Sequence, residues 1–426
     1  MSPTAPPMPT HDTLYKIFTD PIHGFISVPK GLILKLIDHP HVQRLRRIRQ
    51  LGLAYLVFPG GEHSRFSHAL GALGLMQRVL TSLREKNTTI TNNEVEAMMA
   101  AILLHDIGHG PFSHTLESTF IRDFQHEMMT LALMKDLNRE YSGALDTAID
   151  IFTNNHPKKF LHQLISSQLD IDRLDYLKRD SVYTGVLEGS IGVDRIIKTM
   201  RVHQGNIVIE KKGIYAIENY ITSRRLMYMQ VYQHKTVLGA DKLMRSIFRR
   251  VRHLADTKAI KLIFPSPALE YFIRKKPSAK RGITPDMLRQ YTLLDDNDVL
   301  LSIKYWQFNE DPILADLCTR FLSRKFLRTT FTRQDADAPT REKLAGLTAA
   351  ALRKNGLPHD ADAVSYYLFF DQSRNEAYKY ENESIWILDD PKTAVEFSKA
   401  TETKNILALA QTVVKPFVVH MKDVAI

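Results

Sequence analysis

A stripe of apolar side chains on one predicted helix face ends in a histidine and an aspartate. The apolar positions follow the i, i+3, i+4, i+7 spacing of a buried face; they are Val95, Met98, Met99 and Ile102. The next members of the stripe are His105 and Asp106, so both are expected to point into the core. A buried carboxylate is costly unless it is paired or binds a cation. The pattern favours a metal ion, and the alternative is a hydrogen-bonded His–Asp pair in the core.

Thr91 and Glu94 fit a capping box at the start of this helix, and Gly108 is expected to end it. A second helix begins near Ser67 and carries His68 at the edge of its buried side. A third helix, from about 160 to 178, places Asp172 on its apolar face. The alternative for Asp172 is a surface acid, because the run from 170 to 180 holds several aspartates.

Two imidazoles and two carboxylates form a mixed nitrogen and oxygen donor set. Such a set suits Mn²⁺, Fe²⁺, Zn²⁺ or Ni²⁺ and tolerates Mg²⁺ less well. Four protein ligands leave open positions on a six-coordinate ion for water and a phosphoryl oxygen. Around the helix-breaking Gly110-Pro111 pair the chain is dense in further imidazoles and acids: His109, His114, Glu117, Asp123, His126 and Glu127.

Composition limits the class of protein. The 426 residues are 44% hydrophobic and 24% charged, which is typical of a globular protein of two or three domains, or of one large domain with an added lobe. The single cysteine, Cys318, excludes an intrachain disulfide and favours a reducing, cytoplasmic setting. No secretory signal or membrane span is predicted. The net charge of +10 fits an anionic ligand or simply a basic surface.

The remaining pattern indicates a mainly α fold. The segment 32–253 is mostly helical, and a small hairpin is predicted from 206–210 and 213–215. The basic, proline-containing stretch 264–285 is predicted to be a linker or flexible loop. Strands are predicted over 365–370 and 384–388.

The segment Leu104–His114 resembles the central motif of HD-domain phosphohydrolases. Other segments resemble the dNTP triphosphohydrolase branch of this family, which includes animal enzymes with an added sterile-alpha-motif domain and bacterial dGTPase-like relatives: Asp20–Gly24, Gln43–Gly52, Phe58–Gly60, His63–His68, Ile171–Tyr176 and Tyr232–Lys235. The Pro- and Thr-rich start of the chain predicts a flexible tail over 1–14. The resemblance spans about 15–260 and implies a helical HD domain there, and residues 261–426 are expected to form a smaller α+β lobe for oligomerisation or regulation.

The resemblance also implies the reaction and its residues. A deoxynucleoside triphosphate is hydrolysed to deoxynucleoside and intact triphosphate by a divalent metal ion on His68, His105, Asp106 and Asp172. His114, or else His126, is the expected general acid, oriented by Glu117 or Glu127. The substrate-binding positions are Gln50, Leu51, Arg65, His109, Arg173, Tyr176, Asp180, Arg224, Tyr232 and His234.

Some relatives bind an activating guanine nucleotide or dNTP between subunits. The positions that match that site are Lys16, Asp38, Gln43 and Arg46. A homo-oligomer, either a dimer or a tetramer, is therefore expected.

Two other classes stay open. One is another HD hydrolase with the same metal ligands, such as a phosphodiesterase, a nucleotidase or a nuclease. The other is a nucleotide- or nucleic-acid-binding regulator, which the basic run 274–281 permits and the complete ligand set disfavours. A nucleic acid is the less favoured partner.

Overall fold

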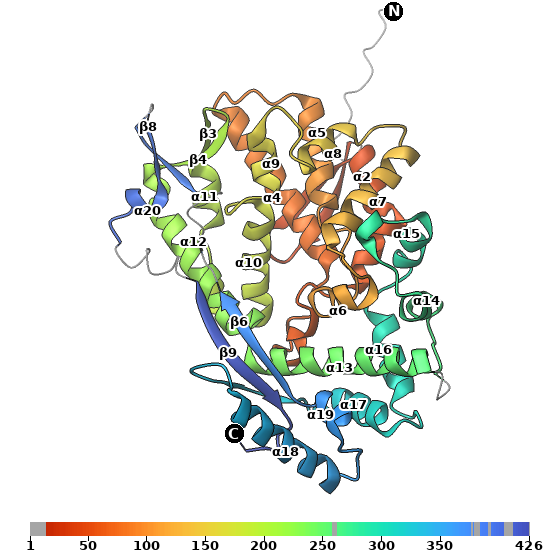
Figure 1. The fold of residues 1–426 in the computed structure, drawn as a ribbon. Coiled ribbons are helices and arrows are strands. Elements are labelled where there is room, and N and C mark those ends of the chain that lie inside the picture. Colours follow the sequence, from red (N-terminus) through yellow and green to blue (C-terminus); the bar gives the residue numbers. More distant parts are fainter. Residues whose placement is uncertain are drawn as a thin grey trace, which may run out of the picture.

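Helices α4 (Arg65–Glu85), α5 (Asn92–Leu104) and α10 (Ile171–Thr184) pack together in the upper part of the molecule (Figure 1). The computed structural model describes residues 14–257, 262–375, 378, 384–390, 393–403 and 412–425, without the side chain of residue 114. The fold is mainly α with a smaller α+β C-terminal portion, as predicted. No helix among these residues has the length and apolar composition of a membrane span.

The N-terminal two thirds of the chain contain one hairpin, then helices, and a second hairpin. Their bounds are β1 (Tyr15–Asp20), β2 (Gly24–Pro29), α2 (Leu32–Asp38), α3 (Pro40–Gln43), η1 (Arg44–Arg47), η2 (Gly52–Leu56), α6 (Ser113–Phe120), α7 (His126–Glu140), α8 (Asp146–Phe152), α9 (Lys159–Ile165), η3 (Leu187–Gly189), α11 (Val193–Thr199), β3 (Met200–His203), β4 (Asn206–Glu210), η4 (Lys211–Gly213), α12 (Ile214–Met227), the π-helical turn η5 (Tyr228–Tyr232) and α13 (Lys235–Thr257).

The C-terminal part surrounds α13, with some of its helices above the right-hand end of α13 and others below it, and it also reaches back to the second hairpin (Figure 1). Its elements are α14 (Pro267–Lys275), η6 (Ala279–Arg281), α15 (Pro285–Tyr291), α16 (Asp296–Trp306), α17 (Pro312–Leu322), β5 (Arg328–Phe331), α18 (Ala338–Lys354), α19 (Ala361–Ser365), β6 (Phe369–Asn375), β7 (Trp386–Asp390), β8 (Thr393–Glu396), α20 (Phe397–Ala400) and β9 (Val413–His420). One sheet has the order β5-β9-β6, and β7-β8 extend the β3-β4 hairpin through a parallel β4–β7 pairing.

The capping box at the start of α5 is confirmed, with Thr91 and Glu94 exchanging both hydrogen bonds. The helix ends at Leu104 rather than at Gly108, and His105 is its C-cap. The predicted third helix is interrupted: α9 ends at Ile165, and α10 begins only after Asp170, whose side chain accepts from the Arg173 N–H. The prediction of one continuous helix was wrong because this cap starts a new helix inside an unbroken apolar pattern.

Three further predictions need correction. The second hairpin pairs β3 with β4, whereas residues 213–215 belong to helical turns. The stretch 264–285 is not a simple linker, because Pro267 occupies the first turn of α14, where its missing N–H is not needed. The strand predicted over 365–370 begins only at Phe369, and the one predicted over 384–388 begins at Trp386. The predicted domain boundary at 260 falls within residues 258–261, outside the described residues, and stays a prediction.

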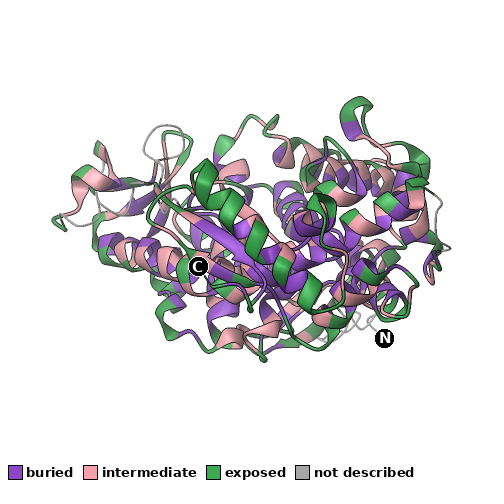
Figure 2. Ribbon diagram, turned by 60° about the horizontal axis from the view of Figure 1, so that its bottom comes forward, coloured by how far each residue is buried: buried purple, intermediate pink, exposed green. Residues whose placement is uncertain are grey.

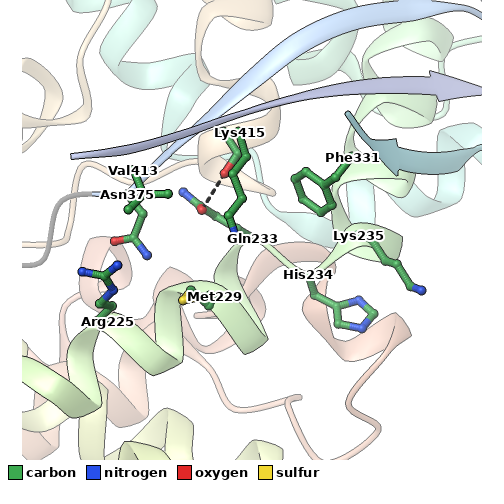
Figure 3. A pocket seen from close by; sticks show the side chains of 10 residues that line it. Arg225, Met229, Gln233, His234, Lys235, Phe331, Asn375, Val413 and Lys415 are labelled. Atoms are coloured by element: carbon green, nitrogen blue, oxygen red, sulfur yellow. Dashed lines mark hydrogen bonds between the residues drawn. The ribbon is translucent and has the colours of Figure 1, made fainter. Parts of the chain in front are cut away.

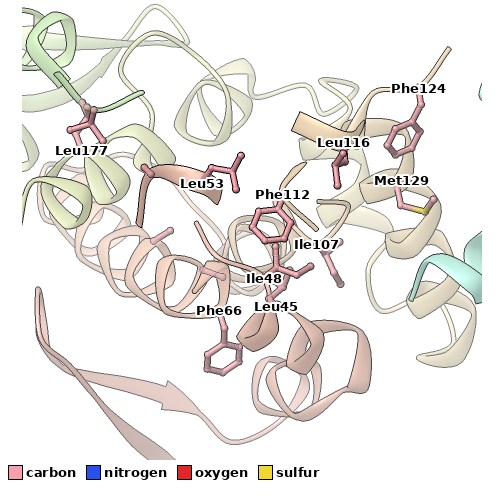
Figure 4. Packing of buried hydrophobic residues seen from close by; sticks show 14 of the residues in the cluster. Leu45, Ile48, Leu53, Phe66, Ile107, Phe112, Leu116, Phe124, Met129 and Leu177 are labelled. Atoms are coloured by element: carbon pink, nitrogen blue, oxygen red, sulfur yellow. The ribbon is translucent and has the colours of Figure 1, made fainter. Parts of the chain in front are cut away.

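Buried residues lie on the inner sides of the elements, and exposed ones cover the outer helix faces (Figure 2). One part of the core joins segments far apart in sequence: Leu45 and Ile48 lie beside Ile107 and Phe112 (Figure 4). The core therefore extends under the turn that carries Asp106.

Gly71 lets α4 approach α10 closely, and we predict that Gly71→Ala destabilises the fold. An added Cβ would lie 2.0 Å from a guanidinium nitrogen of Arg179 and 2.2 Å from a carboxylate oxygen of Asp175. Overpacking of this kind costs about 1–3 kcal/mol. Urea unfolding measures the loss. The control is Gly346→Ala on the open face of α18, which should gain about 0.5–1 kcal/mol. Equal unfolding midpoints for the two variants would contradict the packing described.

Candidate active site

Three side chains from three helix ends converge in the core. His68 lies in the first turn of α4, His105 caps α5, and Asp172 lies in the first turn of α10. The Nε2 atom of His68 is 3.3 Å from the Nε2 atom of His105 and 3.1 Å from Oδ1 of Asp172. The Nε2 atom of His105 is 3.5 Å from the same Asp172 oxygen. These atoms form a compact group that can hold a metal ion.

The hydrogen bonds on the far side of each imidazole fit a cation in this group. His105 Nδ1 lies 2.6 Å from the carbonyl oxygen of Ile102, which can only accept, so Nδ1 carries the proton. His68 Nδ1 lies 2.8 Å from the buried carboxylate of Asp175. With Nδ1 engaged in this way, the two rings direct their Nε2 atoms toward the Asp172 carboxylate. Three facing acceptors are stabilised by a metal ion, and carboxylate or carbonyl partners orient metal-binding histidines in this manner.

The electrostatics of the group also favour a cation. Burial lowers the pKa of His68, but hydrogen bonds and charges from Asp172 and Asp175 outweigh it and raise that pKa to about 10. The pKa of the His105 ring is likewise raised, mainly by Asp106 and Asp172 against the effect of burial. The pKa values of Asp172 and Asp175 are held below their usual range by these imidazoles and by Arg179. The local potential is thus strongly negative.

Asp106 lies at the side of this group and forms a second possible metal-binding group with His109 and His126. Its carboxylate oxygens are 3.8 Å from His68 Nε2 and 3.5 Å from His105 Nε2. Asp106 also accepts a 2.7 Å hydrogen bond from Arg65 and lies 3.3 Å from Nε2 of His109. All four predicted ligands are therefore brought together, and Asp106 connects them to the cationic side of the site.

Asp175 holds a network that sequence analysis did not single out. Its second oxygen lies 2.6 Å from Nε2 of His23, and Arg179 donates to both oxygens. Arg179 also donates to Asp20, so the Asp20–Gly24 turn is fixed against the back of the site. These contacts give a structural reason for the Asp20-Pro-Ile-His-Gly sequence. The sequence shows several aspartates between 170 and 180, but their spacing alone did not indicate which of them forms this network.

His109 and His126 stack with ring centroids 3.8 Å apart. Burial and the charge of Arg65 lower the pKa of His109, so this ring is neutral near pH 7. The carboxylate of Glu117 accepts from the backbone N–H of His126 at 2.5 Å and lies 3.3 Å from its Nδ1. Glu127 lies 3.4 Å from Nε2 of His126 but is more than half exposed. The His114 side chain lies outside the described residues.

A cavity of about 520 Å³ opens beside the metal-binding group. Ten predicted site residues line it: Gln50, Leu51, Arg65, Asp106, His109, His126, Asp172, Tyr176, Asp180 and Tyr232. The Tyr232 hydroxyl donates to Asp180 at 2.8 Å, and the other Asp180 oxygen lies 2.8 Å from His63. Residues not predicted also line the cavity: Gly52, Leu53, Ala54, Phe112, Ser113, Thr115, Tyr228, Val237 and Asp241.

The predicted phosphate-binding arginines differ in their surroundings. Arg65 lines the cavity and is paired with Asp106. Arg173 is paired with Asp170 and donates to the carbonyl of Ser167. Arg224 is largely buried beside Tyr176, and its Nε has no partner among the described residues. Burial lowers the pKa of Arg224, but the neighbouring tyrosines Tyr220 and Tyr176 outweigh it, so the guanidinium stays charged.

His234 lies outside this cavity. The chain is not helical between η5 and α13, and this break turns His234 and Lys235 toward the C-terminal sheet. They line another cavity, of about 420 Å³, with Phe331 and Lys415 (Figure 3). The reason is the turn at Gln233, whose side chain bonds to Ser373 and to the Arg374 carbonyl.

The four residues matched to an activator site lie on one surface. Lys16 is 3.9 Å from Asp38, and Arg46 donates to Gln43 at 2.8 Å. The Gln43 amide in turn donates to the carbonyl of Ile37, next to Asp38.

Comparison with known proteins agrees with this geometry. The HD domain family matches residues 65–180, and the HD associated region matches 191–263. The chain is 34% identical to the uncharacterised protein YwfO of Bacillus subtilis over 86% of this chain and 81% of that protein. A crystal structure of a phosphohydrolase from Bacteroides thetaiotaomicron has a TM-score of 0.90 and 40% identity, over 96% of this chain and 100% of that one. The chain belongs to the HD-domain phosphohydrolases.

A more distant relative has a named activity. The chain is 29% identical to the deoxynucleoside triphosphate triphosphohydrolase SAMHD1 of Bos taurus, over 72% of this chain and 56% of that protein. It therefore spans little more than half the length of that relative.

We predict that Asp175→Asn lowers the affinity for Mn²⁺ by about 10–100-fold, because the amide cannot hold the His68 ring as the carboxylate does. Competition with a chelating dye measures the affinity. Thr184→Ala on the same helix is the control, since within the described part of the chain its hydroxyl bonds only to backbone carbonyls of α10. An unchanged affinity in Asp175→Asn would show that Asp175 does not orient the ligand.

Proposed function

We propose that this protein hydrolyses deoxynucleoside triphosphates to deoxynucleoside and inorganic triphosphate. The observation that carries the proposal is the cavity. It is lined by Asp106 and Asp172 beside the metal-binding group, by Arg65, and by the hydrogen-bonded pair of Tyr232 and Asp180. Phosphate groups need cations, and a sugar hydroxyl needs a polar partner between apolar walls. The relationship to SAMHD1 supports the same reaction.

In this proposal His68, His105, Asp106 and Asp172 would hold a divalent ion, which when bound would supply Lewis-acid polarisation and a water of lowered pKa. Arg65, Arg173 and Arg224 balance the charge of the triphosphate, and His109 donates to a phosphate oxygen. Gln50, Leu51, Tyr176, Asp180 and Tyr232 bind the deoxyribose.

The bond that breaks joins the α-phosphorus to the 5′-oxygen of the sugar. The oxygen of water attacks the α-phosphorus and the water gives up one proton. The deoxynucleoside leaves with the 5′-oxygen, which takes up one proton, and the chain of three phosphates stays intact. His126 is supported as the donor by its place in the cavity and by Glu117, which orients the ring. His114 stays a candidate for this role by resemblance, and Glu127 is the weaker orienting group because it is exposed.

Assembly and location belong to the same proposal. We infer a cytoplasmic homo-oligomer, either a dimer or a tetramer, with a guanine nucleotide or dNTP activating it at Lys16, Asp38, Gln43 and Arg46. The clustering of these four side chains supports one binding surface.

Product analysis tests the reaction. We predict that each purified dNTP with Mn²⁺ yields deoxynucleoside and intact triphosphate on ion exchange, and that Asp106→Ala lowers turnover by at least about 10³-fold because a metal ligand is lost. Added GTP is expected to raise the rate. Lys304→Ala, distant in sequence from the site, is the control. Monophosphate with pyrophosphate as products would instead indicate another HD hydrolase, and rates unaffected by GTP or dGTP would contradict the activator site.

The preference for dNTPs over ribonucleotides tests whether Leu51 and Tyr232 form a wall of the cavity beside the sugar. We predict that dATP exceeds ATP in kcat/KM by about 10–200-fold, because Leu51 and Tyr232 leave no room for a 2′-hydroxyl. Leu51→Ala should reduce this ratio, while Leu56→Ala, at the end of the 3₁₀ helix that Leu51 precedes and outside the cavity lining, should preserve it. Equal turnover of ATP and dATP by the unaltered protein would contradict the proposal that Leu51 and Tyr232 exclude a 2′-hydroxyl.

A further inference from the structure

The turn between α5 and α6 carries Asp106, His109 and Ser113 to the cavity, and its backbone is held mainly by side chains from elsewhere. The hydroxyl of Tyr291 donates to the carbonyl of Gly108 at 2.9 Å. Arg44 donates to the carbonyls of Ile107 and His109 at 2.8 and 2.9 Å. The side chains of Tyr291 and Arg44 are almost fully buried. Hydrogen bonds in such surroundings are costly to lose.

Phe112 in this turn has a strained backbone. Its φ of 44° and ψ of 45° lie in the left-handed region, which a bulky side chain rarely adopts. Its ring is buried and lines the cavity. Its N–H donates to Oδ1 of Asp296 at 3.1 Å. A conformation of this kind persists only where the surroundings hold it.

The other carboxylate oxygen of Asp296 binds the segment that precedes Gln50 and Leu51, which form another wall of the cavity. Oδ2 accepts from the backbone N–H of Arg49 at 3.0 Å and lies 3.4 Å from its guanidinium. Arg49 directly precedes Gln50 and Leu51, which line the cavity. Asp296 is 1% exposed and lies outside the cavity lining. One carboxylate therefore joins two cavity walls that are separated by about sixty residues of chain.

Asp296 comes from the first turn of α16, outside both segments matched to the HD families. The same stretch supplies Tyr291, and its Leu294 carbonyl accepts from Arg44 at 3.0 Å. Burial raises the pKa of Asp296 to about 6, while the backbone N–H groups of Arg49 and Phe112 favour its ionised form. A buried carboxylate in this place needs its donors, and the two backbone N–H groups need the carboxylate.

We propose that Asp296 is a positioning residue that sets the distance between the Gln50–Leu51 wall and the Phe112 wall of the substrate cavity. The change in KM that we expect rests on the proposed dNTP hydrolysis, whereas the change in hydrogen exchange does not. The C-terminal segment 291–296 thereby completes the active site of the helical domain. Substrate fit at the sugar then depends on residues that never contact the substrate.

The test is Asp296→Asn in the full chain. The amide has the same shape but only one acceptor oxygen, so one of the two backbone N–H groups loses its partner. Hydrogen–deuterium exchange should accelerate by about tenfold or more in peptides covering 47–52 or 105–113. In dNTP hydrolysis KM should rise about tenfold with a smaller change in kcat, while bound Mn²⁺ per chain stays unchanged. Asp298→Asn is the matched control, because its carboxylate bonds to the Asp295 N–H and touches neither wall.

Tyr291→Phe is the second variant if Asp296→Asn does not fold. It removes one hydroxyl and should accelerate exchange in 105–113 alone. Unchanged exchange in both variants, or equal acceleration in Asp298→Asn, would overturn the proposal. Faster exchange with wild-type KM and kcat would also overturn it. If the unaltered protein hydrolyses no dNTP, accelerated exchange in Asp296→Asn still supports the positioning role, and only the proposed reaction fails.

Discussion

Two buried imidazoles that face one half-buried carboxylate impose the main constraint on this structure. His68 and His105 turn Nε2 toward Asp172 because the Nδ1 atoms are held by Asp175 and by the Ile102 carbonyl. Such a group is stable only if a cation offsets its charge and if all three helix ends are held in place. The ends of α4, α5 and α10 must therefore meet within hydrogen-bonding distance, and the surrounding fold supplies that precision.

The three helix ends are held in place by residues from distant parts of the chain. On one side Asp175, Arg179 and Asp20 tie α10 to the turn after β1, and Gly71 gives α4 the room to pack there. On the other side the turn after α5 is fixed by Arg44 and by residues near the start of α16. The helical core and the C-terminal part thus share one polar network, which accounts for the burial of charged groups so far from the surface.

Much of the fold could be predicted from local patterns. The apolar stripe and capping box of α5 identified the helix and the inward direction of His105 and Asp106, because both follow from the 3.6-residue period. The break between α9 and α10 could not be seen, since the apolar period runs across it and only the Asp170 cap interrupts it. The parallel pairing of β4 with β7 is equally invisible, because it joins Ile209 to Ile387 without a local signal.

The sequence by itself determined the donor types, their order along the chain and the class of chemistry, since imidazole and carboxylate have fixed ligand properties. Tertiary structure decided which groups share a space. Asp172 and Asp175 are three residues apart on one helix, yet packing turns one toward the cavity and places the other behind His68. His234, two residues after Tyr232, faces a different cavity because the helix breaks between them. Spacing fixes directions within one element, whereas contacts between elements depend on how the whole chain packs.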